Sequence, residues 1–148
     1  MPEWDGPGHS ASFGVGYPNV VANCPKYSAN INNIPMSPAS PQTLPLLNGL
    51  YAESAKLFPD SFTHFGGDEV VENCWLNDPA VVAWMHQQSP NYTAADVYGY
   101  FIKNAYSQAV ANGQSAMFWQ EVFNKYVCVC LCVCVCLYAY CHRCRPHR

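Results

Sequence analysis

Two adjacent carboxylates follow an apolar stretch near the middle of the chain. Asp68 and Glu69 stand directly after the pair Gly66–Gly67 in the run THFGGDEVVENCW. Paired carboxylates can divide acid–base work when one is ionised and the other protonated. On the pair alone, a solvated turn after a strand is an equally good interpretation. A third interpretation is a divalent metal site made by His64, Asp68 and Glu69, although no fourth ligand is evident.

The residues before the pair favour a strand end. In a regular strand, neighbouring side chains point to opposite faces of the sheet. Where a strand twists into a loop, two neighbouring side chains can border one pocket. Gly66 and Gly67 permit this irregular backbone and leave room for a ligand. The pattern therefore predicts a strand over 61–67 with the carboxylates at its C-terminal end.

The elements that would position this site alternate between extended and helical patterns. Asp78 followed by Pro79 marks a helix start, Thr93 or a neighbour caps the next helix, and Asn112–Gly113 ends it. The predicted elements are a strand end at residues 2–5 running into a loop, an irregular connection over 17–41, helices over 41–58, 78–88 and 93–112, and strands over 61–67 and 115–123. Strands separated by helices favour parallel βαβ units.

The composition limits the class of protein. The 148 residues carry a net charge of -3 with 11% charged residues, which suits one domain and gives nucleic-acid binding no electrostatic support. Asn91 opens the N-glycosylation sequon Asn-Tyr-Thr, which favours the secretory route, and no signal peptide is visible after Met1. From sequence alone, the isolated Cys24 and Cys74 are either a disulfide or two buried thiols.

The C-terminal segment differs in kind from the rest. Val or Leu alternates with Cys in VCVCLCVCVCL, and seven of the nine cysteines lie between Cys128 and Cys144. A TGTGTG repeat encodes strict Cys–Val alternation, so we interpret residues 126–148 as low-complexity translation. A soft-metal site lacks polar spacers, and the run from Tyr126 to Cys141 is shorter than the roughly 20 residues of a spanning helix. An edge strand of thiols would be a redox and aggregation liability.

Four ordered motifs resemble those of one known family. HFGGDE at His64–Glu69 resembles the His-x-Gly-Gly-Asp-Glu motif of family 20 glycoside hydrolases, the β-N-acetylhexosaminidases, and EWDGPGH at Glu3–His9 resembles their Glu-x-Asp-x-Pro-Gly-His. CWLNDP and FWQEVF also match in order and spacing. The resemblance implies an α/β fold, a partial (β/α)₈ TIM barrel with strands three to five and their helices. Residues 1–125 would be the partial catalytic barrel, and 126–148 a Cys/Val-rich low-complexity tail.

The resemblance also implies a reaction. Family 20 enzymes hydrolyse terminal non-reducing β-linked N-acetylglucosamine or N-acetylgalactosamine with retention, and the substrate's own acetamido oxygen attacks. Asp68 would position the acetamido group, and Glu69 would be the general acid and then the general base. Burial and the charge of Asp68 would raise the pKa of Glu69. The resemblance implies no cofactor and no metal.

Further residues take supporting roles only by resemblance. Asp5, His9 and His64 would border the pocket or support the carboxylates, with His9 acting through hydrogen bonds. Trp119 would form a wall of the acetamido pocket, and Glu121 would orient neighbours or cap the strand end. Taken alone, Asp5 and His9 are more often structural residues and Trp119 a core residue. We interpret the two remaining tryptophans of this region as packing residues: Trp75 and Trp84.

The cysteine pair and the missing parts are also interpreted through the resemblance. Cys24 and Cys74 stand where animal lysosomal members carry a disulfide, which implies a lysosomal or secreted location. The partner would be a glycan or glycolipid ending in N-acetylhexosamine, and family members often dimerise. The sugar-gripping arginine of the first strand and the pocket residues of the last three strands are absent. We therefore expect a fragment that is inactive alone; the alternative is a non-catalytic truncated product or a residual sugar-binding fragment.

Overall fold

The computed structural model describes residues 1–126, so the predicted tail falls outside the described residues apart from its first residue. In chain order, the elements are α1 (Phe13–Gly16), η1 (Pro18–Val20), η2 (Pro25–Tyr27), η3 (Ile31–Asn33), α2 (Thr43–Leu57), β1 (Phe62–His64), α3 (Glu72–Leu76), α4 (Pro79–Gln88), α5 (Ala94–Ala111), β2 (Ser115–Met117) and α6 (Gln120–Tyr126). None of these helices combines the length and apolar character needed to cross a membrane.

Three segments run in parallel to form the strand layer. β1 pairs with β2 in parallel, with His64 opposite Met117. On the other side of β1, Glu3 forms a parallel bridge with His64, and the Trp4 N–H donates to the His64 carbonyl at 2.8 Å. The strand end predicted near Asp5 is thus a bridged extended segment, and β1 lies between it and β2. The mixed α/β arrangement with parallel strands confirms the predicted α/β class.

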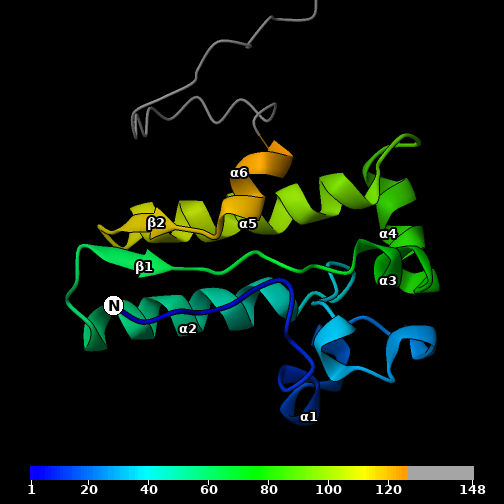
Figure 1. The fold of residues 1–148 in the computed structure, drawn as a ribbon, viewed down its shortest axis with the longest axis horizontal. Coiled ribbons are helices and arrows are strands. Elements are labelled where there is room, and N and C mark those ends of the chain that lie inside the picture. The colour runs from blue at the N-terminus through cyan, green and yellow to red at the C-terminus, as the bar shows by residue number, and fades with distance from the viewer. Residues whose placement is uncertain (127–148) are drawn as a thin grey trace, which may run out of the picture.

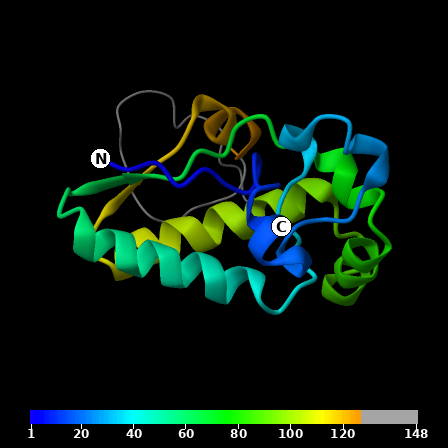
Figure 2. The same ribbon diagram turned by 90° about the horizontal axis from the view of Figure 1, so that it is seen from below.

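The two long helices lie on one face of this strand layer. Figure 2 shows α2 and α5 side by side beneath the extended segments, and in the view of Figure 1 the two helices appear on either side of β1. A 2.9 Å hydrogen bond from Asn104 to Asn48 joins them. Phe65 faces these helices, since it is buried and packs edge-on against Tyr51 of α2 at 4.8 Å. Because side chains alternate along a strand, the neighbour His64 faces the opposite side.

The helix boundaries confirm the local sequence signals. The Asp78 carboxylate accepts from the Ala80 and Val81 N–H groups at the start of α4. Thr93 forms a capping box with Asp96, in which each side chain accepts from the other's backbone N–H. α5 then ends at Ala111, before Asn112 and the left-handed Gly113. These starts and stops were set by short-range chemistry that the sequence displays.

The strand predicted over 115–123 is wrong beyond Met117. The Trp119 N–H still donates to the Gly66 carbonyl at 2.9 Å, but the Val122 N–H turns back to the Trp119 carbonyl and α6 begins. The apolar spacing of FWQEVF is compatible with either element. The helix is favoured because it buries Val122 against the Gly67 backbone.

The long connection over residues 17–41 is fastened to the helices. Cys24 and Cys74 form a disulfide with Cα atoms 5.4 Å apart, which is the expected pair. The Trp75 indole is fully buried and donates to the Met36 carbonyl at 2.7 Å. Trp84 packs edge-on against Tyr100. Trp75 and Trp84 therefore act in packing, as predicted.

Candidate active site

The turn that carries the two carboxylates depends on both glycines. Gly66 and Gly67 have φ angles of 65° and 95°, in the left-handed region that favours glycine. A Cβ at Gly66 would overlap the Asp5 carboxylate, and one at Gly67 would lie 2.5 Å from Cγ2 of Val122. Glu69 also has a positive φ, 51°. Side chains rarely adopt this conformation, and such residues gather at functional sites.

Neighbouring elements hold the turn by its backbone. The Tyr98 hydroxyl of α5 donates to the Gly67 carbonyl, and the Gly67 N–H donates to Oδ1 of Asp5 at 3.3 Å. Oε2 of Glu121 accepts from the Glu69 N–H at 3.3 Å. The Glu121 side chain thus contacts the backbone of the carboxylate-bearing turn. Glu121 itself lies in α6 and not at a strand end.

A hydrogen-bonded chain connects Asp5, His9 and Glu69. Nδ1 of His9 lies 2.6 Å from Oδ2 of Asp5, and Nε2 lies 3.3 Å from Oε2 of Glu69. Burial alone would lower the pKa of His9. The hydrogen bond and charge of Asp5, with smaller effects of Glu69 and Asp68, outweigh it and raise that pKa above its usual 6.5. When protonated, the ring donates to both carboxylates.

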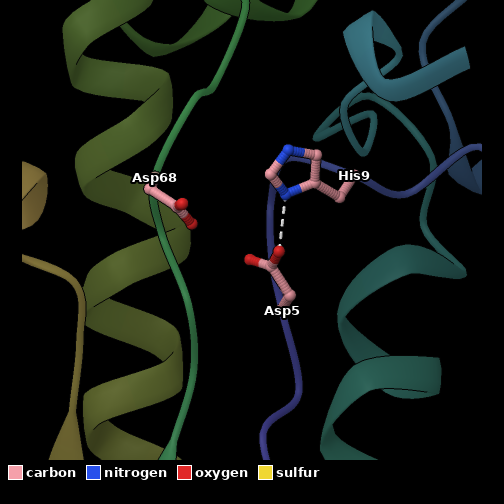
Figure 3. Close-up of side chains that lie close together, drawn as sticks. All are labelled: Asp5, His9 and Asp68. Atoms are coloured by element: carbon pink, nitrogen blue, oxygen red, sulfur yellow. Dashed lines mark hydrogen bonds and ion pairs between the residues drawn. The ribbon is translucent and has the colours of Figure 1, made fainter.

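The Asp68 side chain points toward this series of hydrogen-bonded side chains. Figure 3 shows its side chain extending from the segment after β1 toward the Asp5–His9 pair. Its Oδ1 atom is buried and has no hydrogen-bond partner among residues 1–126. Buried carboxylate oxygens normally have a donor, because leaving them unpaired is costly. Oδ1 of Asp68 therefore lacks the donor that a buried carboxylate oxygen normally has.

Glu69 lies in a more open place than the sequence suggested. Its side chain is 72% exposed, so the expected burial is wrong for the part of the chain described. Within residues 1–126, His9 is the side chain that contacts the Glu69 carboxylate, so the described segments leave most of this side chain open to solvent.

His64 and Trp119 come together on the face opposite the helices. Their rings meet edge-on, with centroids 4.8 Å apart, and the Trp119 side chain is 48% exposed. The Trp119 indole N–H donates to Oε1 of Glu3 at 2.9 Å. Glu3 is a contact that the sequence analysis missed. The period-two rule could have found it, because Glu3 lies two residues before Asp5 and so shares its face.

The alternative of a metal site made by His64, Asp68 and Glu69, against which the resemblance argued, does not correspond to the grouping found. His64 turns to Glu3 and Trp119, whereas within residues 1–126 the grouping of possible metal ligands is Asp5, His9 and Asp68, whose donor atoms lie within 4.8 Å of one another. It shares only Asp68 with that alternative. A cation there would have to displace the short Asp5–His9 hydrogen bond.

A cavity of about 270 Å³ opens beside Asp5 and His9 on the side of α2, but its lining includes neither carboxylate of the turn: Glu3, Trp4, Asp5, His9, Phe13, Leu47, Leu50 and Tyr51. The sequon residue Asn91 is exposed in the turn between α4 and α5. The cavity shares Asp5 and His9 with the carboxylate cluster but does not reach the turn, and Asn91 is not part of the cluster. The cluster itself is formed at the ends of two adjacent parallel segments, by Asp5 and His9 of the first and by Asp68 and Glu69 after β1.

Parallel strands that carry acid–base groups at their ends are typical of a catalytic α/β domain. Comparison with known proteins specifies the family to which this domain belongs. Residues 1–136 match the model described as glycosyl hydrolase family 20, catalytic domain. The chain belongs to this family, as the four motifs indicated. The match runs past Lys125, where we expected the barrel sequence to end, and that boundary stays a prediction.

The relatives are β-hexosaminidases. Subunits A1 and A2 of Dictyostelium discoideum β-hexosaminidase are each 46% identical, over 104 and 101 residues, covering 70% and 68% of this chain but 19% and 18% of those proteins. The solved family 20 exo-β-N-acetylglucosaminidase of Vibrio harveyi, in complex with N-acetylglucosamine, is 26% identical with a TM-score of 0.70. That match covers 82% of this chain and 20% of the other. The chain spans about a fifth of the length of these relatives.

Proposed function

We propose that residues 1–126 supply strands three to five of a β-N-acetylhexosaminidase barrel that hydrolyses terminal β-linked N-acetylglucosamine or N-acetylgalactosamine. The observation that carries this proposal is the buried, unpartnered Oδ1 of Asp68 beside the Asp5–His9–Glu69 chain. The acetamido N–H of such a sugar is a donor of the kind that this oxygen lacks. In this family, the acetamido group is also the nucleophile.

In the first step, the acetamido oxygen attacks the anomeric carbon while the bond to the leaving oxygen breaks. Glu69 gives its proton to that leaving oxygen. Asp68 accepts the acetamido N–H, which orients the nucleophile and offsets the positive charge that develops on the oxazolinium ring. The Asp68 orientation is set by the turn at Gly66 and Gly67.

In the second step, water attacks the anomeric carbon. The bond between that carbon and the oxazolinium oxygen breaks, which regenerates the acetamido group. The Glu69 carboxylate takes a proton from that water. Two inversions at one carbon give net retention. His9, whose pKa is raised, donates a hydrogen bond to the Glu69 carboxylate when Glu69 is ionised. Asp5 in turn orients the His9 ring. His64 and Trp119 would line the pocket, with Trp119 against the acetamido methyl.

The location and the chain's own activity follow from the same proposal. The Cys24–Cys74 disulfide favours an oxidising compartment, consistent with a lysosomal or secreted protein. The exposed Glu69 and Trp119 leave a transition state without walls on several sides. The isolated chain is therefore inactive toward these sugars, and the alternative role is a residual sugar-binding fragment.

The test is a chimera. Residues 1–126 replace the matching segment of Dictyostelium β-hexosaminidase subunit A1, and turnover of a chromogenic N-acetyl-β-glucosaminide is measured. We expect turnover, a loss of about 10²–10⁴-fold in Glu69→Gln with poor leaving groups, and a smaller loss with an activated phenol. Asp68→Asn should slow the chemical step. Glu53→Gln, an exposed glutamate of α2, is the matched control.

Two results would count against this assignment. A folded chimera that cleaves β-glucosides lacking the acetamido group as fast as the N-acetyl substrate needs no internal nucleophile. A Glu69→Gln chimera with unchanged rates for all leaving groups has its general acid elsewhere.

A further inference from the structure

Three side chains from three adjacent parallel segments meet on the face opposite the helices. Oε1 of Glu3 accepts the Trp119 indole N–H at 2.9 Å and lies 3.1 Å from Nδ1 of His64. The His64 ring meets the Trp119 ring edge-on at 4.8 Å. The Nδ1 atom of His64 also accepts the Gly66 N–H at 3.1 Å, so in that protonation state it does not donate to Glu3, and the hydrogen bond of Glu3 in this group is the one to Trp119. Glu3 is the member that contacts both rings.

The strand register explains this meeting. Glu3 is bridged to His64, and His64 pairs with Met117, so these positions share one layer of the same face. Trp119 lies two residues beyond Met117 and returns to that face. Gly66 has no side chain to occupy the next layer, and Asp5 occupies that space. The indole instead extends back toward Glu3, one layer earlier.

The indole N–H is the one polar handle of a tryptophan ring. Trp119 as a residue is 48% exposed, so packing encloses it only in part. Within residues 1–126, the contacts that hold the ring are its hydrogen bond to Glu3 and its edge-on contact with the His64 ring. Loss of the hydrogen bond would leave the ring free to rotate away from His64.

We propose that Glu3 is a positioning residue: its carboxylate fixes the Trp119 indole as a pocket wall and so limits the size of the N-acyl group that the site accepts. This inference rests on the proposed function, because the wall matters only if an acylamino sugar binds. Glu3 does not touch the reacting atoms in this arrangement. It acts through Trp119, while Asp68 and Glu69 keep their own contacts.

The first experiment needs no activity. The 148-residue chain is labelled with ¹⁵N, and its four tryptophan indole N–H signals are recorded, with Trp119 identified by Trp119→Phe. Glu3→Ala should shift the Trp119 signal and speed its exchange with solvent. Glu3→Gln, which keeps an acceptor oxygen, should leave it nearly unchanged. The other three signals report whether each variant is folded.

Either of two results overturns the hydrogen bond. One is a folded Glu3→Ala chain whose Trp119 signal does not move. The other is a wild-type Trp119 indole that exchanges as fast as free tryptophan, a measurement made on the unsubstituted chain once its Trp119 signal is assigned.

The second experiment measures acyl selectivity in the chimera. The ratio of kcat/KM for an N-propanoyl over an N-acetyl glucosaminide is compared between wild type, Glu3→Ala and Glu3→Gln. Loss of one hydrogen bond should raise this ratio about three- to tenfold in Glu3→Ala only. The pH profile should stay unchanged, because Asp5, His9 and Glu69 are untouched. A purely structural role would lower the amount of folded enzyme and leave the ratio constant, which overturns the proposal.

The two failures are distinguishable. A folded wild-type chimera that cleaves no acylamino sugar refutes the proposed function and with it the selectivity role of Glu3. An active chimera with a constant acyl ratio refutes the role of Glu3 alone.

Discussion

Replacing Gly66 with alanine tests how tightly the carboxylate turn is built. The new Cβ would overlap Oδ1 of Asp5 and lie 2.6 Å from its Cγ and 2.9 Å from its Cα. Because a backbone atom is among these neighbours, a change of the Asp5 side-chain rotamer cannot relieve the crowding. We expect the segment around Asp5 to move and its bonds to His9 and Gly67 to break.

The cost can be worked from the separate contributions. An alanine in the left-handed region costs about 1–2 kcal/mol. Loss of the partly exposed Asp5–His9 bond adds about 1 kcal/mol, the low end for such bonds, and the forced shift adds about 1–2 kcal/mol. The free energy of unfolding should therefore fall by about 3–5 kcal/mol in Gly66→Ala.

Two other glycines serve as controls in urea denaturation followed by circular dichroism. Gly113 has φ 73° with no atom within 4 Å of an added Cβ, so Gly113→Ala should show the backbone cost alone, about 1–2 kcal/mol. Gly49 lies inside α2 with open space around it, so Gly49→Ala should stabilise by about 0.5–1 kcal/mol. Equal losses in Gly66→Ala and Gly113→Ala would refute the crowding at Asp5.

Four further results are expected. Replacing Cys24 and Cys74 with serine should lower the free energy of unfolding by about 4 kcal/mol, since the bond closes a loop with a sequence separation of 50; an unchanged urea midpoint would contradict this. His9→Asn should destabilise most below pH 6.5 and progressively less as pH rises through the raised pKa of His9, because the folded state binds that proton more tightly; a pH-independent difference between the urea midpoints of the two proteins would argue against the Asp5–His9 pairing. The 148-residue chain should show no turnover of a chromogenic N-acetyl-β-glucosaminide beside a complete family member, and rates near that enzyme's would refute its inactivity. Expression through the secretory route should add a glycosidase-sensitive mass that Asn91→Gln abolishes; equal masses would mean that Asn91 is not used.

The elements that sequence predicted well are those with short-range signals. The caps at Asp78 and Thr93 and the stop at Gly113 each involve residues within a few positions of one another. The left-handed turn at Gly66–Gly67 was likewise indicated by the glycines themselves. In these places the local sequence carries nearly all the information that the backbone needs.

The features that sequence missed are set by contacts between distant segments. α6 forms where Val122 finds the Gly67 backbone, 55 positions earlier, and no local pattern separates this helix from a strand. Glu69 is exposed because the described segments leave most of its side chain uncovered, which its own sequence does not show. The period-two rule could have placed Glu3 on the face of Asp5, but its contact with Trp119 also requires the strand register, which a single sequence does not provide.

The packing of Val122 on Gly67 also bears on how members of this family can be recombined. The support for the carboxylate-bearing turn after β1 lies in α6, which follows β2, and the Tyr98 hydroxyl that holds the same glycine comes from α5 between them. Exchange of a single strand and its following helix between related proteins would therefore separate the turn from the residues that support it, Val122 and Tyr98. Crossovers placed before Pro2 and after α6 keep these contacts intact, together with the bond from the His64 N–H to the Pro2 carbonyl, so this segment should be exchanged as one unit.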